Sequence, residues 1–117
     1  MTRKILLVDD DINILRLYEI ELKEEGYQVF TASNGEEALK MFKSVEPDLV
    51  SLDVELPDIR GIELLRSMKD MRPGLPIIMF TAYDFTDEFG VWASDAYVVK
   101  SHDLTEIKQK VKELIQR

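Results

Sequence analysis

The sequence predicts an α/β domain in which helices cover both faces of a five-stranded parallel sheet. Short runs of apolar and β-branched residues alternate with longer stretches of helical periodicity, a pattern typical of consecutive βα units. The chain of 117 residues has the size of one domain, and its hydrophobic content of 45% can fill one core. In open parallel sheets, ligands bind at the carboxyl ends of the strands, so a functional site is expected there.

Each strand is predicted from a short apolar run, beginning with KILLV near the N-terminus. The expected strands are Lys4–Val8, Gln28–Ala32, Leu49–Asp53, Ile77–Thr81 and Ala96–Val99. The expected helices between and after them are Ile12–Glu25, Glu36–Val45, Ile62–Asp70, Thr86–Trp92 and Leu104–Gln116. Asn34 and Asp103 each precede a glutamate by three residues, which predicts that they cap the second and the last helix.

The composition excludes several classes of protein. Fifteen basic and 23 acidic residues give a net charge of −8, which disfavours binding to nucleic acids and acidic membranes. The absence of cysteine excludes disulfides and thiolate metal sites. The apolar run ILLV is too short for a signal peptide or a membrane span. We therefore expect one cytoplasmic domain over residues 1–117, with no second domain.

Polar side chains follow four of the predicted strands. They are Asp9 and Asp10 after the first, Asp53 at the end of the third, Thr81 at the end of the fourth and Lys100 after the fifth. Crowded carboxylates repel one another unless they are protonated or bind a cation, and an all-oxygen cluster suits Mg²⁺. A lysine and a hydroxyl nearby could receive the oxygens of a phosphoryl group. Together these groups are what phosphoryl transfer to an aspartate requires.

Each of these residues also has a purely structural interpretation. Aspartates after a strand are common helix caps, and Asp11 is expected to be one. Thr81 alone fits strand propensity, and Lys100 alone fits a solvated surface charge. Asp53 is harder to explain in this way, because a carboxylate at the end of an apolar strand is costly unless it is paired or liganded. The placement of all of them at strand ends favours a functional site.

Five segments resemble, in order, the receiver domain of two-component response regulators. They are KILLVDDD, NGEEAL, PDLVSLDVELPDIRGIELL, PIIMFTA and DAYVVK, and they cover essentially the whole chain. The resemblance implies a flavodoxin-like fold with strand order 2-1-3-4-5. It also implies a histidine kinase or a histidine phosphotransfer protein as phosphodonor, a protein target downstream, and an optional homodimer. Such a domain is not an independent enzyme, although it assists its own phosphorylation and dephosphorylation.

The resemblance also implies a role for each site residue. Asp53 is the phosphoacceptor, and Mg²⁺ is held by Asp9, Asp10, Asp53 and the backbone carbonyl of Glu55. Thr81 and Lys100 contact the phosphoryl group, and Tyr97 is the aromatic residue whose rotamer follows Thr81. The side chain of Glu55 is expected near the phosphoryl site, where it would influence dephosphorylation. The surface of the last two βα units is expected to change on phosphorylation.

The chain departs from the family's pattern in two places. Ser101 replaces the proline that usually follows the lysine, which predicts either a trans bond with a rearranged loop or a strained cis bond. The segment between Thr81 and Lys100 is shorter than usual by nearly one helical turn, so the fourth helix should be short or displaced. It is also rich in aromatic residues, which would either fill the core or form a docking patch. These aromatic residues are Phe80, Tyr83, Phe85, Phe89, Trp92 and Tyr97.

Two other functions fit parts of the sequence. A receiver-like docking module that is never phosphorylated is the main alternative, because the chain has diverged near the site. A phosphohydrolase would use Asp53 as nucleophile and Glu55 as general acid/base, but the chain is too short for the cap that encloses substrates in that family. A flavodoxin-like cofactor protein is disfavoured, since the acidic loop DDDIN replaces a phosphate cradle.

Overall fold

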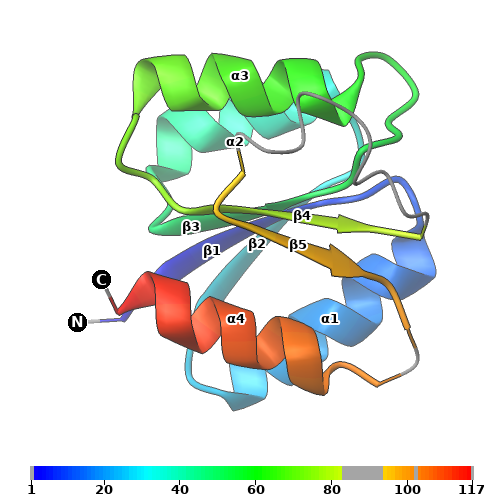
Figure 1. Ribbon diagram of the computed structural model, residues 1–117, viewed down its shortest axis with the longest axis vertical. Helices are drawn as coiled ribbons and strands as arrows, with labels where there is room; N and C mark the ends of the chain where they lie inside the picture. The colour runs from blue at the N-terminus through cyan, green and yellow to red at the C-terminus, as the bar shows by residue number, and fades with distance from the viewer. Residues whose placement is uncertain (1, 83–93, 102, 117) are drawn as a thin grey trace.

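A computed structural model describes residues 2–82, 94–101 and 103–116 of the chain. Five strands form one parallel sheet in the order β2-β1-β3-β4-β5, as predicted. The strands are β1 (Lys4–Val8), β2 (Gln28–Ala32), β3 (Leu49–Leu52), β4 (Ile77–Thr81) and β5 (Ala96–Val99). The described helices are α1 (Ile12–Glu24), α2 (Gly35–Val45), α3 (Gly61–Met71) and α4 (Thr105–Ile115). Helices α2 and α3 cover one face of the sheet, and α1 and α4 cover the other (Figure 1).

The predicted elements agree closely with the structure. The bounds of four strands are as expected, while β3 ends at Leu52, so that Asp53 follows the strand. The predicted helix over Thr86–Trp92 lies outside the described residues. No helix in the described part of the chain is both long and apolar enough to cross a bilayer.

The predicted caps are correct at two helices and wrong at the last one. Asp11 accepts hydrogen bonds from two backbone N–H groups at the start of α1, and Asn34 accepts one from Glu37 at 2.8 Å. The residue before α4 is instead Leu104, whose side chain cannot cap. Asp103 lies one position earlier, and its carboxylate accepts from the N–H and the hydroxyl of Thr105 at 2.9 and 2.6 Å. The carboxylate of Asp103 therefore binds Thr105, the first residue of α4, from outside the cap position.

Successive side chains of each strand point to opposite faces of the sheet, so the core consists of two clusters, one on each face. Leu6 and Val8 of β1 pack with residues of α2 and α3, whereas Ile5 and Leu7 pack with residues of α1 and α4. The central strands β3 and β4 are buried along their whole length. Apolar burial on both faces holds these strands in place and thereby positions the residues at their carboxyl ends.

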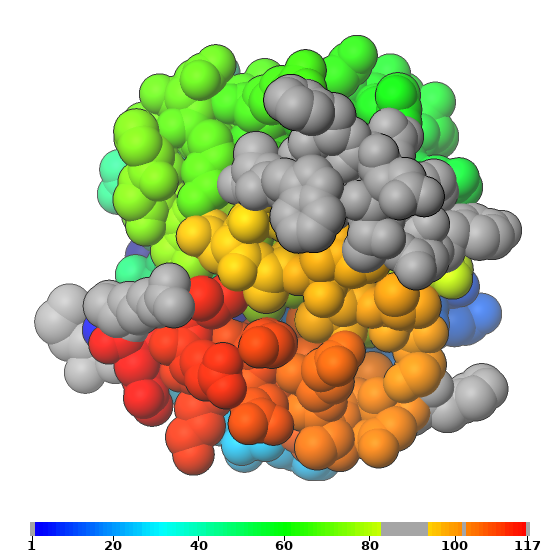
Figure 2. Space-filling view, in the orientation of Figure 1, coloured from blue at the N-terminus to red at the C-terminus, as the bar shows by residue number. Residues whose placement is uncertain are grey.

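The fifth strand, β5, lies at one edge of the sheet. It is close in sequence to both departures from the family's pattern, which are Ser101 and the short segment between Thr81 and Lys100. Part of the strand is visible at the molecular surface between α3 and α4 (Figure 2), where Val99 is 43% exposed, whereas Val98 is buried. The bond between Lys100 and Ser101 is trans, the first of the two predicted outcomes. Among the aromatic residues of this region, Phe80 is buried and Tyr97 is partly buried, as expected for core packing. Tyr83, Phe85, Phe89 and Trp92 lie outside the described residues.

Candidate functional site

The end of β1 places Asp9 in a buried position. Its backbone N–H donates to the carbonyl of Ala32 at 3.1 Å, which continues the pairing of β1 with β2. Only 4% of Asp9 is exposed, and its Oδ1 accepts a hydrogen bond from the N–H of Asp11 at 2.9 Å. Asp10, the next residue, is exposed. The same short turn therefore presents one buried and one exposed carboxylate while Asp11 starts α1.

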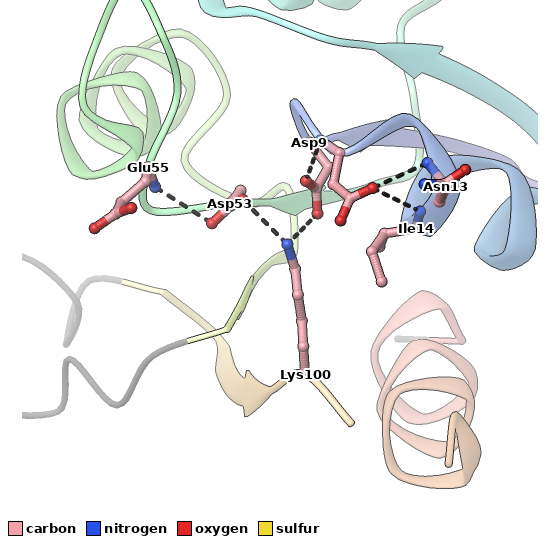
Figure 3. A network of polar contacts seen from close by, with 7 residues as sticks. Asp9, Asn13, Ile14, Asp53, Glu55 and Lys100 are labelled. Atoms are coloured by element: carbon pink, nitrogen blue, oxygen red, sulfur yellow. Dashed lines mark hydrogen bonds and ion pairs between the residues drawn. The ribbon is translucent and has the colours of Figure 1, made fainter. Parts of the chain in front are cut away.

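Asp53 lies beside Asp9 because β3 is paired with β1. Its N–H donates to the carbonyl of Val8 at 3.0 Å, and only 5% of the residue is exposed. Its Oδ1 accepts from the N–H of Glu55 at 3.2 Å. The carboxylate of Glu55 points away from Lys100 (Figure 3), so in this conformation only the backbone of Glu55 faces the site.

Lys100 joins the two buried carboxylates. Its backbone N–H donates to the carbonyl of Thr81 at 2.6 Å, which brings it to the same edge of the sheet. Its Nζ forms an ion pair with Oδ2 of Asp9 and lies 3.1 Å from Oδ2 of Asp53 (Figure 3). Three residues that are far apart in the sequence thus form one ionic cluster at the carboxyl ends of β1, β3 and β5.

The charges in this cluster are strongly coupled. Burial raises the pKa of Asp9 to about 6, although the hydrogen bonds from Lys100 and Asp11 oppose the shift. Burial by itself lowers the pKa of Lys100, but its bonds and charge interactions with Asp9 and Asp53 outweigh this and leave the pKa above its usual value. Two buried carboxylates face one ammonium in this cluster, so their charge can be compensated either by a proton on Asp9 or by a further cation.

Thr81 brings a hydroxyl to the same edge of the sheet. It is the last residue of β4, only 1% exposed, and its Oγ1 has no hydrogen-bond partner among the described residues. A buried hydroxyl without a partner costs about 1 to 3 kcal/mol. Such a cost is expected where a group is kept ready for a ligand. Tyr97, on the neighbouring β5, is partly buried against the cluster on the α2 and α3 side.

The acidic residues fit a divalent ion. One carboxylate oxygen from each of Asp9, Asp10 and Asp53 can be chosen so that all three lie within 4.8 Å of one another. Carboxylate oxygens are the ligands that Mg²⁺ prefers, and the exposure of Asp10 leaves room for the waters that this ion keeps. The fold therefore brings together the three carboxylates of the donor set predicted from the sequence, with Lys100 as the only cation that the described residues place among them.

The loop after Asp53 is held by two features, one of which the sequence did not reveal. A Cβ on Gly61 would lie 2.0 Å from the carbonyl oxygen of Asp53, so only glycine allows α3 to start this close to the site. Asp58 accepts hydrogen bonds from the N–H groups of Gly35 and Glu36 at 2.8 and 2.9 Å, and so caps α2 from another loop. Nothing local to Asp58 indicates this role, because its partners are more than 20 positions away.

The fold and the site define a class of protein: a parallel α/β domain with an acidic cluster, a lysine and a threonine at its switch-point edge. Residues 5–112 match the response regulator receiver domain. The chain therefore belongs to the receiver family of response regulators, as the resemblance in the sequence indicated, and receivers accept phosphoryl groups and are not enzymes in the usual sense.

Similar proteins include regulators of two sizes. The chain is 40% identical to the alkaline phosphatase synthesis transcriptional regulatory protein PhoP of Bacillus subtilis, with 100% of the chain aligned to 50% of the regulator. It is 37% identical to the sporulation initiation phosphotransferase F of the same species, covering 98% of the chain and 95% of that protein. The chain thus spans about half the length of the first relative and nearly all of the second.

Solved structures show the same fold. The response regulator TrrA of Thermotoga maritima, determined in complex with Mg²⁺ and BeF, superposes with a TM-score of 0.93 and is 47% identical over 97% of this chain and 99% of its own. TrrA in complex with the histidine kinase ThkA gives a TM-score of 0.91 over 97% of this chain and 98% of that one.

Proposed function

We propose that Asp53 of this receiver accepts a phosphoryl group in the presence of Mg²⁺, and that Asp9, Asp10, Thr81 and Lys100 assist. The observation that supports this most directly is the placement of two buried carboxylates, Asp9 and Asp53, around the ammonium of Lys100. TrrA, a receiver of similar sequence, was solved with Mg²⁺ and BeF, which fits the same chemistry. Mg²⁺, when bound, would neutralise charge on the reacting oxygens.

Asp53, Lys100 and Thr81 have different roles in the proposed reaction. An oxygen of Asp53 attacks the phosphorus in line, and the bond between phosphorus and the leaving group of the donor breaks. Lys100 transfers its hydrogen bond from the Asp53 carboxylate to a phosphoryl oxygen, and the unpartnered hydroxyl of Thr81 donates to another. The product is an acyl phosphate on Asp53, while the leaving group keeps the electron pair of the broken bond.

Formation of the acyl phosphate then changes the conformation of the surface near β4 and β5. Its charge draws Thr81 toward the site, and Tyr97 on the adjacent strand turns inward, which shifts the surface between two states. In this proposal the 117 residues form one receiver unit in the cytoplasm that binds a downstream protein rather than nucleic acid, and a homodimer is one form that the altered surface could support.

A histidine kinase or phosphotransfer protein must bring its phosphoryl group to Asp53, and α1 offers a surface for this. The helix starts directly after the acidic turn, and its outer face carries exposed apolar residues, with Ile12 58% and Ile20 57% exposed. Exposed apolar side chains beside a reactive group suit protein docking. We expect Ile20→Asp to slow phosphotransfer from a kinase, tested with ThkA, but not phosphorylation by acetyl phosphate. Equal slowing of both would argue against docking on α1.

Intact mass spectrometry tests the proposed function. The protein is incubated with acetyl phosphate, with and without Mg²⁺, as wild type, as Asp53→Asn and as Asp70→Asn. Asp70 is exposed on α3 and serves as a matched control. We expect a single Mg²⁺-dependent phosphoryl adduct on wild type and Asp70→Asn and none on Asp53→Asn. An absence of adduct on the wild type would instead favour a docking module that is never phosphorylated, and steady release of phosphate from a phosphomonoester would favour a hydrolase.

A further inference from the structure

The ring of Phe80 lies beneath the ammonium group of Lys100. Phe80 is the residue of β4 directly before Thr81, it is only 3% exposed, and it belongs to the core cluster on the α1 and α4 side. The Nζ of Lys100 lies over its ring, 5.8 Å from the centroid. A cation within about 6 Å of an aromatic face is attracted by the negative charge density of that face.

A second aromatic ring supports Phe80 from behind. Tyr18 of α1 is 2% exposed, and its ring meets that of Phe80 edge-on, with centroids 5.2 Å apart and planes inclined by 68°. This edge-to-face arrangement is a favourable geometry for two aromatic rings. Because both rings are buried, the face that Phe80 presents to Lys100 has a fixed position.

A ring in a fixed position can restrict where the ammonium group of Lys100 lies, which the flexible lysine side chain does not do by itself. Its four-carbon stem is flexible, and its ammonium has no preferred geometry toward carboxylates. Lys100 is paired with Asp9 and Asp53, and in the proposed reaction its hydrogen bond to Asp53 is given up. The attraction to the ring of Phe80 requires neither carboxylate, so the chemical change at Asp53 does not remove it.

We propose that Phe80, supported by Tyr18, is a positioning residue that holds the ammonium of Lys100 at the phosphorylation site. This role rests on the proposed function of Asp53. It adds the requirement that residue 80 be aromatic, which the acidic cluster alone does not impose. An aromatic ring at this position of β4 would then raise the rate of phosphoryl transfer through Lys100, while an aliphatic side chain of similar size would fill the core without doing so.

Fluorinated phenylalanines separate the electrostatic role from packing. Site-specific replacement of Phe80 with mono-, di- and trifluorophenylalanine weakens the negative face of the ring step by step while its size changes little. We expect the rate constant for phosphorylation by acetyl phosphate with Mg²⁺ to fall with each fluorine, by about 2- to 30-fold in total. Phe42 provides the matched control, since it is also 3% exposed and Arg72 lies 5.9 Å from its ring centroid, away from the site. The same series at Phe42 should leave the rate unchanged.

Stability measurements without metal give an independent test. Urea unfolding of the Mg²⁺-free protein is measured for Phe80→Leu, Lys100→Met and the double variant. If the ring binds the ammonium, Phe80→Leu destabilises the protein less in the Lys100→Met background than in the wild type. Equal destabilisation in both backgrounds, or a flat fluorine series on a wild type that is phosphorylated, would overturn the proposal. If the wild type forms no adduct, the proposed function of Asp53 fails, and the unfolding cycle alone decides whether Phe80 holds Lys100.

Discussion

The Nζ of Lys100 lies 3.1 Å from Oδ2 of Asp53, although 47 positions separate the two residues. Asp9 binds the same ammonium from the other side. In the unphosphorylated protein this lysine therefore compensates two buried carboxylates, and in the proposed reaction it would also neutralise a phosphoryl oxygen.

Replacement of Lys100 should slow phosphorylation strongly. We expect Lys100→Met to lower the rate of adduct formation from acetyl phosphate by about 100-fold, because one charged donor to the transferring group is lost. The measurement is the initial rate of adduct formation by intact mass spectrometry at saturating Mg²⁺. Lys40→Met is the control, since the Lys40 side chain is 77% exposed on α2. A rate within twofold of wild type for Lys100→Met would contradict a role in transfer.

Asp9→Asn should stabilise the Mg²⁺-free protein. The pKa of Asp9, raised to about 6 by burial, means that its charged form is disfavoured in the folded state. An uncharged asparagine removes this cost, which we put at about 1 to 3 kcal/mol in the free energy of unfolding at pH 7.5. Urea unfolding measures the change. Added Mg²⁺ should stabilise the wild type more than Asp9→Asn, and an equal response would argue against Asp9 as a ligand.

The raised pKa of Asp9 also predicts how the free energy of unfolding depends on pH. Between the ordinary carboxyl pKa of 3.8 and about 6, the folded protein holds more protons at Asp9 than the unfolded chain does. The contribution of Asp9 to the free energy of unfolding is therefore fully present below pH 3.8 and is lost as the pH rises through 6. The difference in stability between Asp9→Asn and wild type should accordingly grow between pH 4.5 and 7 without Mg²⁺. A difference that is constant over this range would contradict the raised pKa.

Gly61→Ala should destabilise the loop that carries the site. The added Cβ would lie 2.0 Å from the carbonyl oxygen of Asp53, and this contact is with backbone that cannot easily move. We expect a loss of about 3 kcal/mol in the free energy of unfolding, together with slower phosphorylation. Gly74→Ala is the matched control, because a Cβ there would meet no atom within 4 Å. Similar losses for both variants would show that the close approach at Gly61 is unimportant.

Thr81→Val should separate stability from activity. The buried hydroxyl of Thr81 lacks a partner among the described residues, so an isosteric methyl group should raise the free energy of unfolding by about 1 kcal/mol. The same change removes a donor to the phosphoryl group and should slow phosphorylation. Thr81→Ser, which keeps the hydroxyl, should retain most of the rate. A valine variant that is less stable than the wild type would indicate that the hydroxyl is satisfied in solution.

Asp58→Ala should lower the melting temperature by removing the cap that one loop provides to α2. Hydrogen bonds from the N–H groups of Gly35 and Glu36 hold the pKa of Asp58 below its usual value. The stabilisation is therefore present above the ordinary carboxyl pKa and is lost as the pH falls through the lowered value. Asp58→Asn, which keeps an acceptor, should lie between the alanine variant and the wild type. An alanine variant that melts like the wild type at pH 7 would contradict the cap.

The sequence by itself determined the order of the strands and helices along the chain and the residue types at the strand ends. These features are local: β1 and β4 are readable as apolar runs, and the acids, the threonine and the lysine directly follow or end such runs. The resemblance to receivers then supplied the strand order, which the local pattern does not contain. The last helix cap was wrong because hydrogen bonds at Asp103 depend on how the chain enters α4.

Only the tertiary structure decided which of these groups meet and how they are satisfied. The ion pairs of Lys100, the missing partner of Thr81 and the cap from Asp58 all depend on distances between residues that are remote in sequence. The same holds for the ring of Phe80 beneath Lys100, because the sequence shows only an aromatic residue in an apolar strand. Periodicity specifies the face of the sheet on which a side chain lies, whereas contacts across the edge of the sheet are set by the packing of the strands and helices together.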